Sequence, residues 1–328
     1  MSSSPASVCP ICLSSDAHQV SALDRHGKAL ATIVCRACGH VHNDPIPTDA
    51  ELEDFYSNHY RVAYKGAARP RPRQIARNFK RMEAFFKAWW PLMRSRRRVL
   101  DAGSGSGEFL YFAANLGLEA LGVEPNRDYS AYTRDDLGLN VITARIDDQD
   151  FAPGSFDLIR LNHVLEHLND PVAALSRLNG WLADDGILYV EVPNIIDYAR
   201  TKSRGNMFHY GHISNFSPWT LRACAGRAGL IELAEVKSEL GETTGTFFRK
   251  GPAWSAKDAV YRANAERVQA AIKAHYSGTR SPIDRAVRLA QKLTMRLSEA
   301  RIGGKLGEPA KIGAHYLDRF RAGGQGRG

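Results

Sequence analysis

The chain has 328 residues, 44% of them hydrophobic, and contains five cysteines. This length fits one large domain with additions or two to three small ones, and the composition is ordinary for a protein that buries a core. No run approaches the roughly 18 apolar residues of a membrane span, and the first residues lack the features of a secretory signal. We therefore expect a cytoplasmic protein whose cysteines are metal ligands or free thiols rather than disulfides.

The net charge of +9 is concentrated in two segments. Residues 61–98 contain 13 Lys and Arg against one acid, and residues 251–328 contain 15 against six. Two basic segments around a near-neutral middle favour an anionic partner, such as phosphate groups, nucleic acid or a lipid surface. A solvated surface that serves solubility explains the same pattern, so both interpretations stay open.

Two Cys-x-x-Cys pairs, separated by 22 residues, stand near the N-terminus. Their members are Cys9, Cys12, Cys35 and Cys38. The spacing predicts a zinc ribbon with tetrahedral coordination, and short strands over 18–22 and 29–34 would flank a turn between the pairs. Four thiolates leave no open position on the ion, so we expect a structural zinc; disulfides or iron are the alternatives. His40 and His42 are interpreted as ordinary polar residues.

The next segment predicts a short helix, a linker and a long helix. Thr48 or Asp49 could cap the short helix, and the basic residues 61–74, with glycine and prolines, indicate a linker that could also order over a bound substrate. Residues 75–90 have apolar side chains at helical spacing, which favours core packing over a binding face.

A glycine-rich turn follows the short apolar run that ends at Leu100. Residues 109–116 then have apolar side chains at helical spacing. A second apolar run, 120–123, then ends on Glu124. The turn contains Asp101, Gly103, Ser104, Gly105 and Gly107. Glycines suit such a turn because a side chain would block a ligand from the backbone. Glu124 ends its strand where a carboxylate can accept hydrogen bonds from both hydroxyls of a ribose.

Further alternation of helices and strands predicts an α/β fold with a parallel sheet. Helices are expected over 129–137, 171–182 and 217–228, with a turn at 184–186. Strands are expected over 140–144, 156–161, 187–192, 230–238 and 244–250. Asn162 and His163 follow the strand over 156–161, at the carboxyl edge where such sheets bind ligands.

The stretches DAGSGSG (101–107) and FDLIRLNHVLEHLNDP (156–171), with Glu124, resemble class I S-adenosylmethionine-dependent methyltransferases. Residues 35–60, CRACGHVHNDPIPTDAELEDFYSNHY, look like the zinc-binding leader of some of them, including deoxysugar C-methyltransferases. The resemblance implies a Rossmann-like seven-stranded methyltransferase sheet that binds S-adenosylmethionine. The glycine loop would hold the methionyl end and Glu124 the ribose, while Ile146 and Asp147 would lie near the adenine. Glu166 and His167 are expected on the next helix, where we favour a structural role for His167.

Residues 208–217 occupy the position of a substrate-side lid, and in the deoxysugar enzymes a Glu-His pair there is linked to proton abstraction. Here His212 matches the histidine, but Gly211 stands where the acid would be. His212 could act as a general base with a pKa near neutrality, with His163, His209 or Tyr210 beside it, or it could only order the lid. Both interpretations stay open.

Residues 255–276 and 282–301 predict two helices, and the second has a basic amphipathic pattern. It could lie on an anionic membrane, bind a polyanion or dock on the catalytic domain. The glycine- and arginine-rich tail 303–328 is expected to be mobile. The deoxysugar enzymes usually have a further α/β domain at this point, which weakens the case for C-methylation and leaves O-methylation open.

The sequence thus predicts four segments: a zinc ribbon (1–60), a basic linker and helix (61–96), a methyltransferase domain (97–250) and a basic helical extension (251–328). The predicted function is S-adenosylmethionine-dependent O- or C-methylation of a small-molecule, sugar or glycan acceptor. An RNA methyltransferase and a non-catalytic adaptor are the alternatives, and nucleic acid is the less favoured partner. The pattern specifies no oligomeric state.

Overall fold

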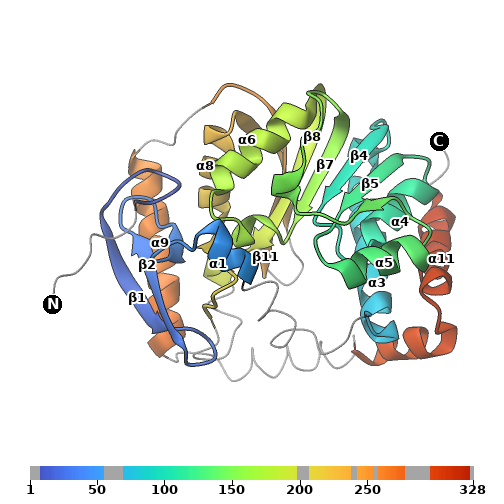
Figure 1. Cartoon of the computed structure of the whole chain (residues 1–328), viewed down its shortest axis with the longest axis horizontal. Helices are drawn as coiled ribbons and strands as arrows, with labels where there is room; N and C mark the ends of the chain where they lie inside the picture. Colours follow the sequence, from blue (N-terminus) through green and yellow to red (C-terminus); the bar gives the residue numbers. More distant parts are fainter. Residues whose placement is uncertain are drawn as a thin grey trace. The chain divides into compact units, whose positions relative to one another are not determined.

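The structure is a computed structural model. It describes residues 8–54, 69–197, 207–237, 242–253, 258–277 and 296–325. The chain forms two compact units: the first contains Met1–Tyr64 and Leu161–Thr279, and the second contains Lys65–Arg160 and Arg280–Gly328. Figure 1 shows the elements of both. The division into four segments made from the sequence remains a proposal.

One sheet has seven strands, as the resemblance implied, and their order is β10-β11-β8-β7-β4-β5-β6. Their bounds are β4 (Arg98–Ala102), β5 (Glu119–Val123), β6 (Val141–Ile142), β7 (Phe156–Asn162), β8 (Leu182–Pro193), β10 (Leu230–Lys237) and β11 (Thr243–Lys250). Strands β4, β5 and β6 pair in parallel, and β8, β11 and β10 pair antiparallel. The fold class predicted from the sequence is therefore confirmed.

The turn predicted at 184–186 is wrong, because β8 already begins at Leu182, directly after helix α6 (Pro171–Trp181). Asp-Asp-Gly is typical of turns, but here the segment is extended. Asp184 accepts a hydrogen bond from the ammonium group of Lys250 on β11 at 3.3 Å, and a Cβ on Gly186 would come within 2.8 Å of Leu182. Contacts of the strand thus override the local turn preference.

The second unit is built around the strand–glycine loop–helix–strand core that the sequence predicted. Its helices include α3 (Pro72–Met93), α4 (Glu108–Asn115), α5 (Arg127–Asp135) and α11 (Pro309–Phe320). Ile75, Phe79 and Phe86 of the apolar stripe of α3 are buried and the rest of the stripe is half-buried, in agreement with a role in core packing. Phe86 of α3 lies 5.0 Å from the ring of Phe112 on α4 and 6.2 Å from the ring of Phe320 on α11, as ring centroids.

The expectation of a mobile tail is wrong for residues 309–320, which form α11 and pack against α3 (Figure 1). Ile312, Tyr316 and Phe320 recur every four residues and are fully buried, so one face of this helix belongs to the core. Residues 282–295 of the second predicted helix lie outside the described residues, and residues 296–306 are helical.

The first unit contains a four-stranded sheet of order β1-β2-β3-β9. Its strands are β1 (Ala17–Leu23), β2 (Ala29–Cys35), β3 (Val41–Asn43) and β9 (Ser214–Asn215), and β1 and β2 agree with the two strands predicted between the cysteines. Helix α9 (Asp258–Ser277), predicted over 255–276, contributes Val268 and Ile272 to a core with Val34 and Val41. The N-terminal segment is thus part of the same core as a helix some 230 residues later in the chain.

This unit also contains the helices α1 (Asp49–Asp54) and α8 (Pro218–Arg227). Thr48 caps α1, since its hydroxyl accepts from the Glu51 amide and its own amide donates to the Glu51 carboxylate. Residues 55–68, which include most of the predicted linker, lie outside the described residues. No helix in the described ranges is long and apolar enough to cross a membrane.

Candidate functional site

The glycine loop of the second unit connects β4 to α4 in a conformation that needs glycine. Gly103, Gly105 and Gly107 have φ angles of 81°, 54° and 76°, in the left-handed region. A Cβ on Gly107 would come within 2.6 Å of the Thr133 side chain, whereas a Cβ on Gly105 would meet no atom within 4 Å. Space is therefore open beside the loop at Gly105, where a ligand could approach the backbone.

Glu124 ends β5 and is bound to this loop. Its carboxylate accepts the Gly105 amide at 2.7 Å and the Asn126 amide at 2.9 Å, on different oxygens. Ser104 of the loop has a buried hydroxyl oxygen without a hydrogen-bond partner among the described residues. The loop and the acid, predicted as one site, are thus brought together, and this hydroxyl lies in the same loop.

Asp101 lies at the end of β4 and is fully buried. Burial raises the pKa of Asp101, while Arg160 of β7, whose guanidinium donates to the carboxylate at 2.8 Å, opposes the shift. Arg160 in turn lies over the ring of Phe109, 4.8 Å from its centroid. Arg160 was not predicted as a site residue. Its position as a lone arginine within the apolar strand FDLIRLN could have indicated a buried charged partner.

Ile146 and Asp147 lie in a 3₁₀ turn, η2 (Ile146–Asp148), shortly after β6. Ile146 is buried, whereas Asp147 is exposed and faces the guanidinium of Arg145 at 3.4 Å. This loop belongs to the same unit as the glycine loop. The turn thus places a buried apolar side chain next to an exposed carboxylate that faces Arg145.

In the first unit, Asn162 ends β7, and His163 follows with an unusual φ of 56°. The His163 ring lies between two carboxylates, with Nδ1 3.3 Å from Glu166 and Nε2 3.4 Å from Glu191. Burial opposes the charged ring, but the two carboxylates raise the pKa of His163 to about 10. A non-glycine residue at positive φ is typical of sites where a side chain is held for function.

Three further histidines gather on the predicted lid and beside it. The Nδ1 of His167 donates to the carbonyl oxygen of Gly211 at 2.5 Å. The His212 ring lies 4.9 Å from the His167 ring and 3.8 Å from the His209 ring, as centroids. Burial, and then the charges of His167 and His209, lower the pKa of His212 well below its ordinary value. His212 is therefore a neutral imidazole at pH 7.

Glu166 and His167 were expected on the next helix, but this prediction is wrong. They lie in a 3₁₀ turn, η3 (Leu165–His167), before helix α6 begins. Asp170 ends this turn region by capping α6 through the Ala173 amide at 2.9 Å. The short turn directs Glu166 toward the histidines. Glu191 was missed altogether; its one signal is that it interrupts the apolar end of the strand ILYVEVP.

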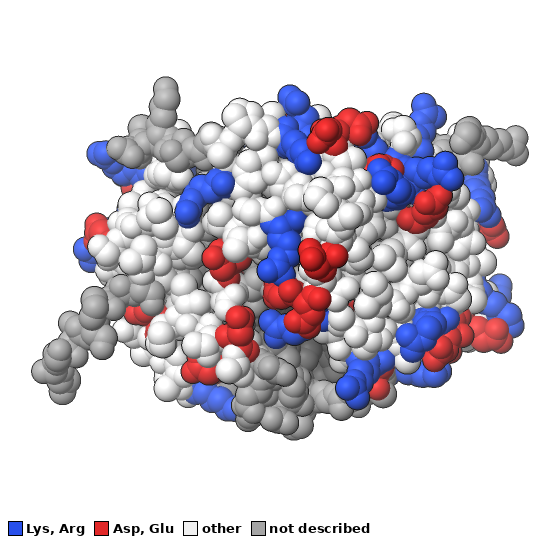
Figure 2. All heavy atoms as spheres, turned by 45° about the horizontal axis from the view of Figure 1, so that its top comes forward, with Lys and Arg blue, Asp and Glu red and all other residues white. Residues whose placement is uncertain are grey.

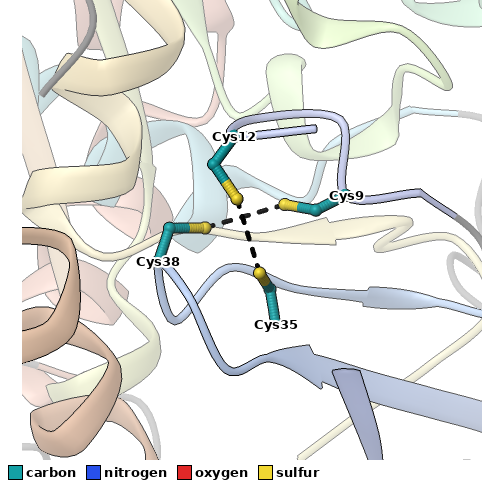
Figure 3. A group of neighbouring side chains, drawn as sticks. All are labelled: Cys9, Cys12, Cys35 and Cys38. Atoms are coloured by element: carbon teal, nitrogen blue, oxygen red, sulfur yellow. Dashed lines mark hydrogen bonds between the residues drawn. The ribbon is translucent and has the colours of Figure 1, made fainter. Parts of the chain in front are cut away.

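The four N-terminal cysteines converge, as Figure 3 shows. The sulfur of Cys9 lies 3.6 Å from that of Cys38, and the sulfur of Cys12 lies 3.5 Å from that of Cys35. All four sulfurs lie within 4.8 Å of one another. Tetrahedral zinc–thiolate bonds of about 2.3 Å place sulfurs about 3.8 Å apart, so this donor set fits a zinc ion.

The two nearby histidines are outside this cysteine group. His40 hydrogen-bonds Ser214 of β9 at 3.2 Å, and the Nδ1 of His42 lies 2.9 Å from the carbonyl oxygen of Asn43. Both rings are buried and stacked, with centroids 5.7 Å apart. They are structural polar residues of the four-stranded sheet.

The comparisons with known proteins point to one activity. A family model described as a methyltransferase domain matches residues 68–233. An uncharacterized methyltransferase of Mycobacterium sp. strain JLS is 28% identical over 174 residues, 48% of this chain and 68% of that protein. A ubiquinone biosynthesis O-methyltransferase of Methylococcus capsulatus is 33% identical over 91 residues, 25% of this chain and 38% of that protein. The C-methyltransferase NovU of Streptomyces niveus is 27% identical over 124 residues, 36% of this chain and 29% of that protein.

Proposed function

Because the chain belongs to the methyltransferase-domain family, we propose that it transfers a methyl group from S-adenosylmethionine to an oxygen or carbon of a small-molecule, sugar or glycan acceptor. Methyl transfer is the activity of the family, and the acceptor class is our proposal. One relative is named an O-methyltransferase and another a C-methyltransferase, which supports oxygen and carbon as the candidate atoms.

The observation that carries the cofactor proposal is the link between Glu124 and the glycine loop, 2.7 Å from carboxylate to amide. In this proposal the open side of Gly105 receives the methionyl end, and Glu124 accepts the ribose hydroxyls. Ile146 and Asp147 line the adenine. The proposed cofactor residues also include Asp101, Gly103, Ser104, Gly107, Asn162 and His163. When bound, the sulfonium supplies an activated methyl group, and the task of the protein is to align it with the acceptor.

On the acceptor side, we assign the proton-removing role to His212. Its imidazole is neutral and can accept a proton, but the lowered pKa makes it a weak base at pH 7. His209 beside it is also a weak base, since burial lowers the pKa of His209 to about 2. An acceptor proton that is easily lost, such as that of an acidic hydroxyl or of a carbon next to a carbonyl group, suits such a base.

We further propose that the four cysteines hold a structural zinc ion. The cysteine segment is tied to the rest of its unit by Arg227, which donates to the carbonyl oxygen of Pro10 at 2.6 Å, and by Asn264, which donates to that of Cys38 at 2.7 Å. Strand β3 then supports the lid, because the Asn43 amide donates to the Ile213 carbonyl at 3.0 Å. Zinc would thus stabilise the sheet on which the lid residues rest.

The test is methyl transfer from radiolabelled S-adenosylmethionine to separate panels of nucleotide-sugars, glycans, small hydroxylated metabolites and RNA. We expect label in a small-molecule or glycan panel, and loss of that label with Glu124→Gln.

Figure 2 shows Lys and Arg interspersed with Asp and Glu on the face that it displays. Label confined to RNA would contradict the proposed acceptor, and absence of both transfer and cofactor binding would favour the adaptor alternative.

A further inference from the structure

We propose that Glu166, His167 and His212 bind one divalent metal ion in the first unit, separate from the four-cysteine group. One carboxylate oxygen and two imidazole nitrogens from these residues lie within 4.8 Å of one another. A carboxylate with two imidazoles is a ligand set that suits Zn²⁺, Fe²⁺ and Mn²⁺ and leaves coordination positions open for another ligand. The three residues come from two segments, the turn η3 and the lid.

The Glu166 carboxylate is the central observation, because it is buried with an unused oxygen. Glu166 is only 1% exposed. Its Oε1 lies 3.3 Å from His163 Nδ1, whereas its Oε2 has no hydrogen-bond partner among the described residues. A buried carboxylate oxygen without a partner is costly to desolvate. A cation at Oε2 would supply the missing interaction.

His167 is oriented as a metal ligand requires. Its Nδ1 donates to the carbonyl oxygen of Gly211, so Nε2 is the ring nitrogen that carries the lone pair. That Nε2 lies 3.9 Å from Oε1 of the Glu166 carboxylate, a separation that two ligands of one small cation can have. A backbone carbonyl that fixes the other nitrogen is the usual outer support of a metal-binding histidine.

His212 is held in place by the backbone of its loop. The His212 amide donates to the His209 carbonyl at 3.0 Å, and the Asn43 side chain donates to the Tyr210 carbonyl at 3.1 Å. The ring meets that of His167 at an interplanar angle of 79°. The loop is therefore positioned before any ion binds, which lowers the ordering that binding requires.

With the ion bound, His212 would be one of its ligands rather than the group that accepts the acceptor proton. A divalent cation lowers the pKa of a coordinated hydroxyl group, so an acceptor hydroxyl bound to the ion would release its proton to water without the imidazole as base. The acceptor class that this favours is a molecule with a hydroxyl or carbonyl oxygen able to enter the open coordination positions. This consequence rests on the proposed function, whereas the binding of the ion does not.

The test uses the full-length protein with a zinc content of one ion per chain, so that zinc occupies the cysteine group alone, and Mn²⁺ as the probe, because Mn²⁺ prefers oxygen and nitrogen over thiolate ligands. Loss of the free Mn²⁺ signal in electron paramagnetic resonance measures binding. We expect one Mn²⁺ per chain, and at least about tenfold weaker binding in Glu166→Gln and in His212→Asn. Glu308→Gln, which removes an exposed carboxylate at the start of α11, is the matched control and should bind like the wild type.

Absence of Mn²⁺ binding to the wild type, or unchanged affinity in both ligand variants, would overturn the inference. Circular dichroism and binding of S-adenosylhomocysteine, measured on the same samples, show whether each variant is folded. Cofactor binding without Mn²⁺ binding would remove the metal site and leave the proposed function standing. Mn²⁺ binding without cofactor binding would support the metal site and contradict the proposed function.

Discussion

At the scale of single residues, Glu124 has two tasks that share one carboxylate. It braces the glycine loop through the Gly105 amide and the next helix through the Asn126 amide. It is also the residue that we assign to the ribose. Because the same oxygens hold the loop and would hold the ligand, the loop is preorganised for binding.

We predict that Glu124→Gln weakens binding of S-adenosylhomocysteine at least about tenfold, because hydrogen bonds to a charged acceptor contribute about 1.5–3 kcal/mol each. The amide side chain keeps the size but replaces one acceptor oxygen with a donor. Titration calorimetry measures the change. Glu119→Gln, at the exposed start of the same strand, is the control and should bind normally; equal affinity of the two variants would remove Glu124 from the site.

Some site residues could be predicted from the sequence and others could not, for a physical reason. The glycine loop and Glu124 belong to one continuous strand–loop–helix–strand unit, so local spacing specifies both. Glu166 and His212 lie 46 positions apart in the chain, and their approach depends on η3 and on the pairing of β3 with β9. Such contacts arise only from tertiary packing, which no local pattern encodes.

At the scale of elements, the start of β4 is fixed by one carboxylate. Asp157 of β7 accepts the amides of Arg97 and Arg98 at 3.0 and 2.8 Å, and the Arg98 guanidinium at 2.7 Å. Although burial opposes it, these donors lower the pKa of Asp157 below its ordinary value. The resulting stability is present above the unfolded-state pKa of about 3.8 and is lost as the pH falls through the lower folded-state pKa.

We predict that Asp157→Asn lowers the free energy of unfolding by about 2 kcal/mol at pH 7, since the charged acceptor is lost. The difference from the wild type should shrink below about pH 4, as the wild-type carboxyl group takes up a proton. Urea unfolding between pH 3 and 7 measures this, with the exposed Asp150→Asn as control. A difference independent of pH would mean that the charge of Asp157 is unimportant.

Helix α11 has an apolar stripe that can be recognised in the sequence, although the overall composition of the tail does not indicate a helix. The glycines and arginines around it favour a mobile tail, yet Ile312, Tyr316 and Phe320 form an apolar stripe of four-residue spacing. The stripe is short, and its partner, α3, lies more than 200 residues earlier. Composition over a long window therefore gave the wrong expectation for a helix of three turns.

We predict that Phe320→Ala lowers the free energy of unfolding by about 3–5 kcal/mol, because it opens a cavity among buried rings. Phe320 lies 6.1 Å from both Trp90 and Phe112, as ring centroids. Chemical denaturation measures the loss. Leu297→Ala removes a side chain that is 73% exposed and should change stability by no more than about 0.5 kcal/mol; similar losses in both variants would contradict the packing role of α11.

We predict that the order of strands β1 and β2 depends on zinc bound by the four cysteines. Cys35→Ser should lose bound zinc and the local order of β1 and β2, since three thiolates bind zinc less well than four. Zinc analysis and hydrogen exchange of residues 8–43 measure both effects. Cys224→Ala, at a buried cysteine outside the group, should keep one zinc per chain; full zinc content in Cys35→Ser would overturn the four-cysteine assignment.

In the whole molecule, the α/β fold with a parallel sheet was predictable because alternating strands and helices admit few topologies. The two compact units were not predictable, since each combines segments from distant parts of the chain. The N-terminal cysteine segment shares a unit with residues 161–279, and α11 shares one with the glycine loop. Composition shifts indicate linkers, but they do not say which distant segment a helix packs against.

The proposed cofactor site is best tested by calorimetric titration of the purified, zinc-containing protein with S-adenosylhomocysteine. We predict one binding site per chain, with affinity that falls in Glu124→Gln and is retained in Glu119→Gln. Absence of binding to folded, zinc-containing wild-type protein would contradict the assignment of the glycine loop and Glu124 as a cofactor site.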